Sequence, residues 1–394
     1  MDSKRIFALL FLVVSLVPSQ ARAQAYTVTD LGPLAPSAIN TWAQVVGDYN
    51  HKAYVWTRSG GLKDLGVLAG GRFSHATAIS DLGAVTGTAD GPFTIISPYA
   101  DEGFPNVDCT DLTQPFVWTP AGGMRGLGTV FLSQDGEILS DYSSWCDISF
   151  FAQGINVLGQ VVGYTSAIST YQFGFVWTSA GGMSTFGGSY PPTFINGISG
   201  TGQMVGENGD CEAIPATCFV GSATTWKHGV AANLESLGGE VEGYSSAANG
   251  VNDLGQAVGW SATAPITPGS ENGWTGEVPI HALLWSAGGA IRDLGTLPGD
   301  TLSSASRINL FGLVIGVSGS EVAAPTNEDP RYEITGRPFI WCKSSGMHDL
   351  NTLIPESSGW VLNTAADINI WGQIVGSGTH NGEPRGYLLT PKVL

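Results

Sequence analysis

Carboxylates and aromatic rings gather in a few irregular segments of this sequence, and they are the side chains best suited to chemistry. Clustered carboxylates and backbone carbonyls can bind Ca²⁺ through hard oxygen ligands, although no segment has the spacing of an EF-hand. An exposed Trp or Tyr beside acids can stack on a sugar or contact a cationic partner. The candidate ligand-binding residues are Asp108, Asp111, Asp141, Tyr142, Trp145, Asp210, Glu212 and Trp274. Ca²⁺ is the only cofactor considered for them, and a solvated acidic surface is the simpler interpretation.

Signatures of known enzyme classes are absent from the sequence. It contains no His-Glu-x-x-His, no Cys-x-x-Cys, no Gly-x-Ser-x-Gly and no phosphate-cradling loop. Two carboxylates on one surface could still act as acid and base on a glycoside, but any acidic protein offers such pairs. We assign no catalytic residue and no metal ligand, and we expect a non-enzymatic protein. A secreted glycoside hydrolase or polysaccharide lyase is the alternative.

Residues 1–23 have the features of a secretory signal peptide. Lys4 and Arg5 precede an apolar stretch, and Ala21-Arg22-Ala23 offers small residues for cleavage before Gln24. The apolar stretch is shorter than the roughly 20 residues that span a bilayer. We therefore expect a secreted, extracellular protein, with the periplasm or the cell surface as other destinations. An uncleaved amino-terminal anchor is the alternative.

The charge of the mature chain restricts its partners. Removing three basic residues (Lys4, Arg5, Arg22) and one acidic residue (Asp2) from totals of 16 and 33 leaves 13 and 32, a formal charge of −19. Nucleic acid and anionic membranes would be repelled by such a protein. We expect neither nucleic-acid binding nor membrane insertion.

Three short signatures recur seven times in a fixed order, which indicates a repeat architecture. The first is Ile-Asn-x-x-Gly-Gln-Val-Val-Gly, best seen at 155–163, with copies at 39–47, 79–87, 198–206, 251–259, 308–316 and 368–376. The second is an apolar run ending at Trp56, Trp118, Trp177, Trp226, Trp285, Trp341 or Leu389. The third is Asp-Leu-Gly or a relative, at Asp30, Asp64, Gly126, Thr185, Ser236, Asp293 and Asp349.

Each repeat predicts four short strands. Asn-x-x-Gly supplies a turn between the first two strands, because Asn can bond its own backbone and Gly accepts a positive φ. The run ending in Trp is rich in the aromatic and β-branched residues that strands prefer. A pair such as Gly122-Gly123 then turns the chain into a fourth strand, which carries Asp-Leu-Gly. The repeated residues are therefore interpreted as core and turn residues.

The two ends of the chain predict a closed ring. The last repeat stops at Leu389-Thr390-Pro391 without a fourth strand, whereas Tyr26–Leu34 is a fourth strand with no repeat before it. A ring can pair the two halves and leave no end of the repeat array exposed. We predict one all-β domain over 24–394, a seven-bladed β-propeller with four-stranded blades, closed by the amino-terminal strand pairing with the last blade.

Loop lengths predict a functional rim. The connection between the second and third strands varies from 9 to 31 residues, whereas the turn between the first two strands never changes in length. In an antiparallel blade, these variable connections and the links between blades lie at one end, which we call the long-loop rim. Rigid scaffolds commonly carry binding loops in this way, although insertions without a function are the alternative.

The five cysteines lie partly on this rim. Cys109 and Cys146 fall in neighbouring long segments, and Cys211 and Cys218 share one. In an exported protein we predict the disulfides Cys109–Cys146 and Cys211–Cys218, with Cys342 single. Five cysteines also allow other pairings.

The segments Asp293–Gly299 and His281–Trp285, together with the Asn-x-x-Gly motif, resemble the HAF family of extracellular repeat proteins, named for a His-Ala-Phe triplet. The resemblance covers nearly the whole mature chain and implies a bacterial protein that is secreted or surface-displayed, with no particular activity. The residues that match His281 are Lys52, Gln114, Phe173, Ser222, Arg337 and Arg385. Such variation argues against a ligand site shared by all repeats.

We therefore expect a binding or surface-interaction scaffold that acts through its long-loop rim. Its extracellular ligand would be a carbohydrate or another protein, and the chain itself is expected to be a monomer.

Overall fold

The computed structural model describes most of the chain after the predicted signal peptide. The described residues are 25–91, 93–96, 107–109, 113–130, 148–167, 173–186, 193–209, 221–238, 245–264, 279–323 and 333–392. In β8, β9 and β12, introduced below, the backbone alone is described. None of the helices in these ranges is long and apolar enough to span a membrane.

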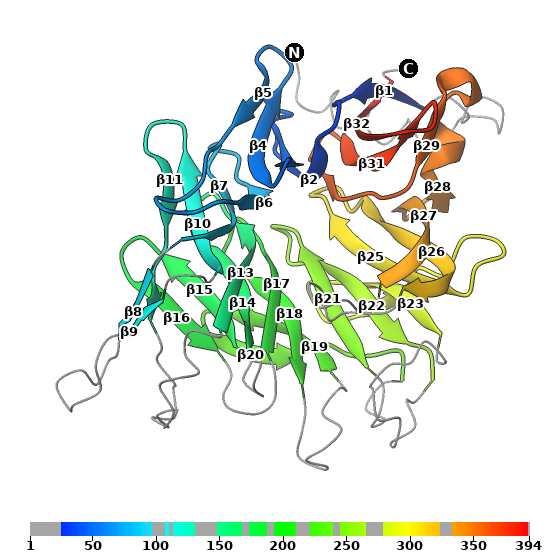
Figure 1. Cartoon of the computed structure of the whole chain (residues 1–394). Helices are drawn as coiled ribbons and strands as arrows, with labels where there is room; N and C mark the ends of the chain where they lie inside the picture. Colours follow the sequence, from blue (N-terminus) through cyan, green and yellow to red (C-terminus); the bar gives the residue numbers. More distant parts are fainter. Residues whose placement is uncertain are drawn as a thin grey trace, which may run out of the picture.

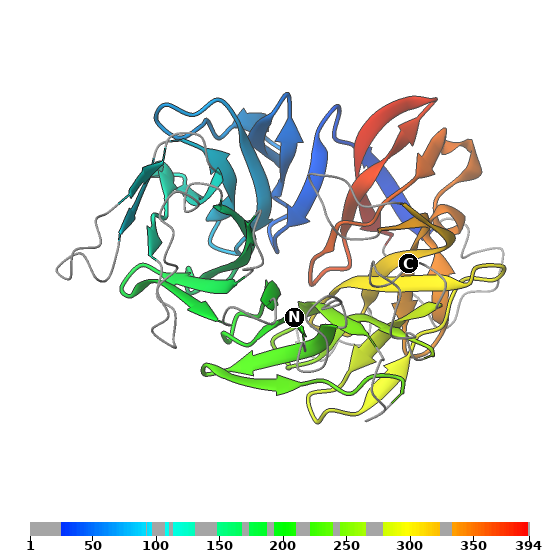
Figure 2. The ribbon, with the colours of Figure 1, turned by 60° about the horizontal axis from the view of Figure 1, so that its bottom comes forward.

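The chain forms an all-β, seven-bladed propeller, which confirms the predicted fold (Figures 1 and 2). Blade 1 contains β2 (Ala35–Ile39), β3 (Val45–Tyr49), β4 (Lys52–Thr57) and β5 (Gly61–Asp64). Blade 2 contains β6 (Ser74–Ile79), β7 (Val85–Asp90), β10 (Thr113–Thr119) and β11 (Gly123–Gly126). Blade 3 contains β13 (Ile148–Ile155), β14 (Val161–Ala167), β15 (Gly174–Thr178) and β16 (Gly182–Phe186). Blade 4 contains β17 (Thr193–Ile198), β18 (Met204–Gly209), β19 (Gly221–Lys227) and β20 (Val230–Asn233).

The remaining blades follow the same plan. Blade 5 contains β21 (Ser246–Val251), β22 (Ala257–Ala262), β23 (Ile280–Trp285) and β24 (Ile291–Asp293). Blade 6 contains β25 (Leu302–Ile308), β26 (Val314–Ala323), β27 (Glu333–Cys342) and β28 (Gly346–Asp349). Blade 7 contains β29 (Trp360–Leu362), β30 (Asp367–Ile368), β31 (Ile374–His380), β32 (Glu383–Pro391) and β1 (Tyr26–Asp30). Outside the blades are β8 (Phe93–Ile96), β9 (Val107–Cys109), β12 (Thr129–Val130) and the 3₁₀ helices η3 (Leu350–Leu353) and η4 (Glu356–Ser358).

The ring closes through β1, as the two incomplete ends of the sequence predicted. β1 pairs antiparallel with β32, from Tyr26 opposite Pro391 to Asp30 opposite Tyr387. The pairing continues beyond the strand, because Leu31 N–H donates to the Gly386 carbonyl over 2.9 Å. Blade 1 therefore lies beside blade 7 on the ring, as the blue and red ribbons of Figure 2 show.

The apolar core lies between neighbouring blades. Val55 and Leu65 of blade 1 pack in one buried cluster with Phe116 and Trp118 of blade 2. On the outer strands, the cations Lys63 and Arg125 lie over the rings of Trp118 and Trp177 in the following blade. The repeated Trp is therefore a packing residue, as predicted, and its ring is covered by residues of the preceding blade, among them a cation at Trp118 and at Trp177.

The last Gly of the repeated Ile-Asn-x-x-Gly-Gln-Val-Val-Gly motif is required for steric reasons. In blades 1 to 6 the first strand has an irregular register, as between Ala152 and Gly154 of β13. Beside this irregularity, a Cβ on Gly163 would overlap the backbone carbonyl of Phe151 and meet the Phe175 ring. A side chain at this position would therefore push the first two strands apart.

The strand register corrects one alignment of the repeats. In blade 4 the residue that occupies the place of Asp64 or Asp293 is Asn233, which pairs with Thr224. Ser236, the residue that the sequence pattern indicated, lies three positions beyond it. The turn before β20 is one residue shorter than its counterparts, so the chain reaches this position earlier.

We predict that Thr29→Pro in β1 lowers the free energy of unfolding by about 2–3 kcal/mol, because proline has no N–H for the ladder that closes the ring. Thr29→Val keeps the N–H and the branched shape and is the matched control. Urea denaturation checks this, and equal midpoints for the two variants would contradict a role of β1 in closure.

We predict that Gly163→Ala costs about 3 kcal/mol of stability through steric overlap with β13. Gly288→Ala is the control, since the nearest atom to a Cβ there is the Ser286 hydroxyl at 3.9 Å. Thermal unfolding of both variants checks the difference, which should appear as a large fall in Tm for the first variant alone.

Candidate functional site

Most of the predicted ligand-binding residues lie outside the described residues. Asp108 lies in β9, whose backbone alone is described. The other seven lie outside the described residues: Asp111, Asp141, Tyr142, Trp145, Asp210, Glu212 and Trp274. Of the cysteines predicted to pair, Cys109 lies in β9, and Cys146, Cys211 and Cys218 lie outside the described ranges. These predictions stay predictions.

In blades 1 and 5, the residue at the position of His281 is paired with an Asp side chain. His281 Nδ1 lies 2.9 Å from Asp293, and Lys52 Nζ lies 3.3 Å from Asp64 at the same places in blade 1. Each pair joins the third strand to the end of the fourth strand of one blade. Within the described residues, no group of three His, Cys, Asp or Glu side chains is arranged to hold a metal ion.

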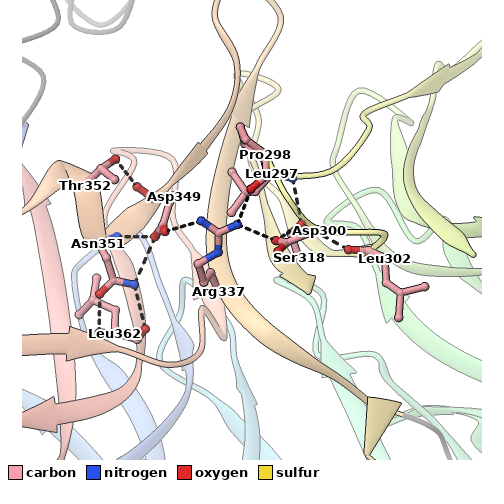
Figure 3. A network of polar contacts seen from close by, with 10 residues as sticks. All are labelled: Leu297, Pro298, Asp300, Leu302, Ser318, Arg337, Asp349, Asn351, Thr352 and Leu362. Carbon is pink, nitrogen blue, oxygen red and sulfur yellow. Dashed lines mark hydrogen bonds and ion pairs between the residues drawn. The ribbon is translucent and has the colours of Figure 1, made fainter. Parts of the chain in front are cut away.

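Blade 6 has the most extended version of this pair (Figure 3). Arg337 lies 3.4 Å from Asp349 in its own blade and 2.9 Å from Asp300, which precedes β25. Asp300 also accepts a hydrogen bond from the Ser318 hydroxyl over 2.8 Å. Since every member has a protein partner, this network links segments of the blade and is not an open binding site.

The pKa of Asp293 shows the effect of such a pair. Partial burial opposes ionisation of its carboxyl group, but hydrogen bonds from His281 and from the Gly295 N–H outweigh burial, so the pKa is lowered. The contact with His281 therefore stabilises the ionised carboxyl group of Asp293 and links the third strand of blade 5 to the fourth.

The opposite end of the propeller is built from the invariant turns. We call it the turn rim, and it consists of the turns between first and second strands (40–44, 80–84, 156–160, 199–203, 252–256, 309–313 and 369–373) with the turns between third and fourth strands. In the turn of blade 7, the Asn369 side-chain carbonyl accepts from the N–H groups of Trp371 and Gln373. Its amide nitrogen donates to the Asn40 carbonyl of blade 1 over 3.1 Å.

The same bond recurs around the rim. The side-chain amide of each turn asparagine donates to the carbonyl of the equivalent residue in the next blade, at 3.0–3.2 Å, for Asn40, Asn156, Asn252, Asn309 and Asn369. Ser80 and Ser199 occupy the other two positions. The Asn of the motif therefore shapes its own turn and fixes that turn against its neighbour.

The third residue of these rigid turns is apolar in six of seven copies. These residues are Trp42, Leu82, Leu158, Leu254, Phe311 and Trp371, with Thr201 in blade 4. Five of them are 47% to 78% exposed. The turn rim thus presents a ring of large apolar side chains to solvent, and exposed apolar patches commonly mark interaction surfaces.

Two adjacent members of this ring are held in fixed orientations. The indole N–H of Trp371 donates to the Thr41 carbonyl, and that of Trp42 donates to the Asp81 carbonyl, each over 3.0 Å. Each ring therefore reaches to the turn of the next blade. Because ring closure makes blades 7 and 1 neighbours, the two indoles lie on consecutive turns.

The turn rim does not share the acidity of the whole chain. Its two carboxylates, Asp81 and Asp253, accept hydrogen bonds from the backbone N–H groups of Thr41 and Gly200 in the preceding blades. Exposed cations stand on the turns between third and fourth strands, at Arg58, Lys227 and Lys343. An anionic ligand is therefore repelled less here than the net charge suggests.

A cavity of about 570 Å³ opens between the turns of blades 5, 6 and 7. Leu254, Phe311 and Trp371 of the ring contribute to its wall, and Arg292 and Lys343 are the charged residues in the lining. The volume falls within the range of small-molecule sites. This cavity and the two fixed indoles are the candidate functional site of the described chain.

Cys342 also lines the cavity and has a free thiol. Partial burial opposes formation of its thiolate, but hydrogen bonds from the hydroxyl and backbone N–H groups of Ser344 and Ser345 together outweigh burial, so the pKa of the thiol is lowered. The thiol can therefore report on what occupies the cavity.

The sequence contains a pattern that indicates the exposed apolar ring of the turn rim. Turn positions are usually polar, whereas the third residue of the repeated Asn-x-x-Gly segment is Trp, Leu or Phe in six copies. Loop length, in contrast, indicates the long-loop rim. The cavity has no such signal, because its wall combines residues from three blades.

Comparisons with known proteins support the fold alone. No protein-family model and no curated protein sequence matches the chain. Among solved structures, "Oligogalacturonate lyase in complex with manganese" is similar at 11% identity, with 94% of each chain covered and a TM-score of 0.51. The β-propeller domain of the Trilobed protease from Pyrococcus furiosus is 10% identical over 93% of this chain and 96% of that chain, with a TM-score of 0.47. At such identity the first match indicates a shared propeller architecture.

We predict that alkylation of Cys342 reaches its maximal rate at a lower pH than alkylation of free cysteine. Ser345→Ala removes a hydroxyl that donates to the thiolate over 3.0 Å, so it should move the rate profile to higher pH. Rates measured by mass mapping of the Cys342 peptide check this, and Ser286→Ala, elsewhere in the lining, is the control. Superimposable profiles for wild type and Ser345→Ala would contradict the assignment.

Proposed function

We propose that this chain is a secreted, non-enzymatic binding protein that holds a carbohydrate on its turn rim. The observation that carries the proposal is the pair of exposed indoles of Trp371 and Trp42, each fixed by a hydrogen bond to the next turn. Predicted secretion and the resemblance to HAF repeat proteins support an extracellular ligand.

The two indoles have the properties that sugar binding requires. A pyranose ring presents an apolar face of C–H groups, and a large flat aromatic side chain covers such a face at little entropic cost when it is already fixed. Trp42 is 74% exposed, so its ring is available to a ligand. The Thr41 hydroxyl, on the same turn as Trp42, donates to the Asp81 carboxylate.

The long-loop rim is a second proposed surface, for carbohydrate or protein. The residues proposed there are those named from the sequence, including Asp141 and Trp145. The competing function is a polysaccharide hydrolase or lyase that uses long-loop carboxylates, and one experiment separates it from binding.

We predict that the protein is retained by at least one of cellulose, chitin, xylan and polygalacturonate, and that Trp42→Ala weakens retention about 30-fold. An aromatic anchor at a binding site contributes about 2 kcal/mol when truncated. Depletion of protein from solution by each polysaccharide gives the affinity.

Leu158→Ala is the matched control, because Leu158 holds the same turn position in blade 3 at similar exposure. Failure of every polysaccharide to retain the wild type, or equal losses for Trp42→Ala and Leu158→Ala, would contradict the proposal. Release of reducing ends that disappears in Asp141→Asn would instead establish the enzymatic alternative.

A further inference from the structure

We propose that the cavity between blades 5, 6 and 7 is a binding site for a small amphipathic anion, a molecule with an aromatic or alkyl body and one carboxylate or sulfonate group. This site goes beyond the carbohydrate surface proposed above. Trp371 lines the cavity, but Trp42 does not, so the two sites can be tested separately.

The wall of the cavity selects an apolar body. Leu254 and Phe311 come from the turns of blades 5 and 6, Trp341 from the end of β27, and Trp371 from the turn of blade 7. The asparagine bonds from Asn252 to Asn309 and from Asn309 to Asn369 hold these three turns together at 3.0 Å. The wall is therefore preorganised, which reduces the entropy that a ligand must lose.

The charged groups select an anion. Arg292 and Lys343 line the cavity, and neither has an ion-pair partner among the described residues. The Arg292 guanidinium lies 5.9 Å from the centre of the Trp341 ring, so a cation–π contact holds it at the wall.

No carboxylate among the described residues neutralises these two cations. The lining contains no Asp or Glu, and the nearest acids along the chain have other partners. Asp253 accepts from the Gly200 N–H of blade 4 over 2.6 Å, and Asp293 is paired with His281. The cavity is thus a positively charged, largely apolar site in a chain of net charge −17, and the complementary ligand is negative at one end.

A pair of fluorescent dyes tests this inference directly. 8-Anilino-1-naphthalenesulfonate and N-phenyl-1-naphthylamine share one aromatic body, but only the first carries a sulfonate. The sulfonated dye should bind the wild type about tenfold more tightly than the neutral dye, as one charge contact of about 1.4 kcal/mol would give. Fluorescence titration measures both dissociation constants.

Variants of the two cations locate the bound sulfonate. Arg292→Gln and Lys343→Gln should each weaken the sulfonated dye about tenfold and leave the neutral dye unchanged. Arg125→Gln and Arg58→Gln are the matched controls, because Arg125 covers Trp177 as Arg292 covers Trp341, and Arg58, like Lys343, stands two residues after the repeated Trp.

Two further measurements place both dyes inside the cavity. Ala290→Trp should abolish binding of both dyes by filling the space, and its main-chain bond to Ser286 does not depend on the side chain. Saturating sulfonated dye should slow alkylation of Cys342 in the unaltered protein, a readout that needs no variant. Trp42→Ala should leave dye binding unchanged while it reduces polysaccharide retention.

Several results would overturn the inference. They are equal affinity for the two dyes, no effect of Arg292→Gln and Lys343→Gln beyond their controls, or unaltered dye binding in Ala290→Trp. Loss of dye binding in Trp42→Ala would place the dye on the exposed indoles instead. A failure of polysaccharide retention alone would reject the carbohydrate proposal and leave this site intact.

Discussion

The antiparallel pairing of β1 with β32 is the constraint on which the rest of the structure depends. It joins the first described strand to the last blade, from Tyr26 opposite Pro391 to Asp30 opposite Tyr387, and so supplies the outer strand of blade 7. Closure also makes blade 1 the neighbour of blade 7. The hydrogen bond from Asn369 to Asn40, and the contact of Trp371 with Thr41, exist only because of this neighbourhood.

Within the closed ring, the asparagine of each Asn-x-x-Gly turn has a structural role, and the third residue of the turn is exposed to ligands. The asparagine carbonyl shapes the turn and its amide holds the next blade, as for Asn309, which binds Phe311, Leu313 and the Asn369 carbonyl. The side chain of the third turn residue takes no part in these asparagine bonds and can vary. It is an exposed Trp in blades 7 and 1 and contributes to a cavity wall in blades 5 and 6, so one scaffold offers two kinds of site.

Much of the fold could be predicted from the sequence, because the same local chemistry recurs seven times. The Asn-x-x-Gly turn, the buried Trp strand and the orphan strand at Tyr26–Leu34 each appear where the repeats indicated. Blade 4 departs from the repeat pattern. Its turn between the third and fourth strands is one residue shorter, and Asn233 holds the place that Ser236 was expected to hold. The candidate site was harder to predict, because loop length directs attention to the long-loop rim.

The sequence by itself determined the number of blades, the order of strands and the route of closure, because these follow from local turn residues and from which half-repeat lies at each end. Only the tertiary structure decided which side chains meet on the turn rim. Trp371 and Trp42 stand at opposite ends of the chain, and Arg292 and Lys343 belong to different blades. Their proximity depends on the packing of one blade against the next, which no spacing along the chain encodes.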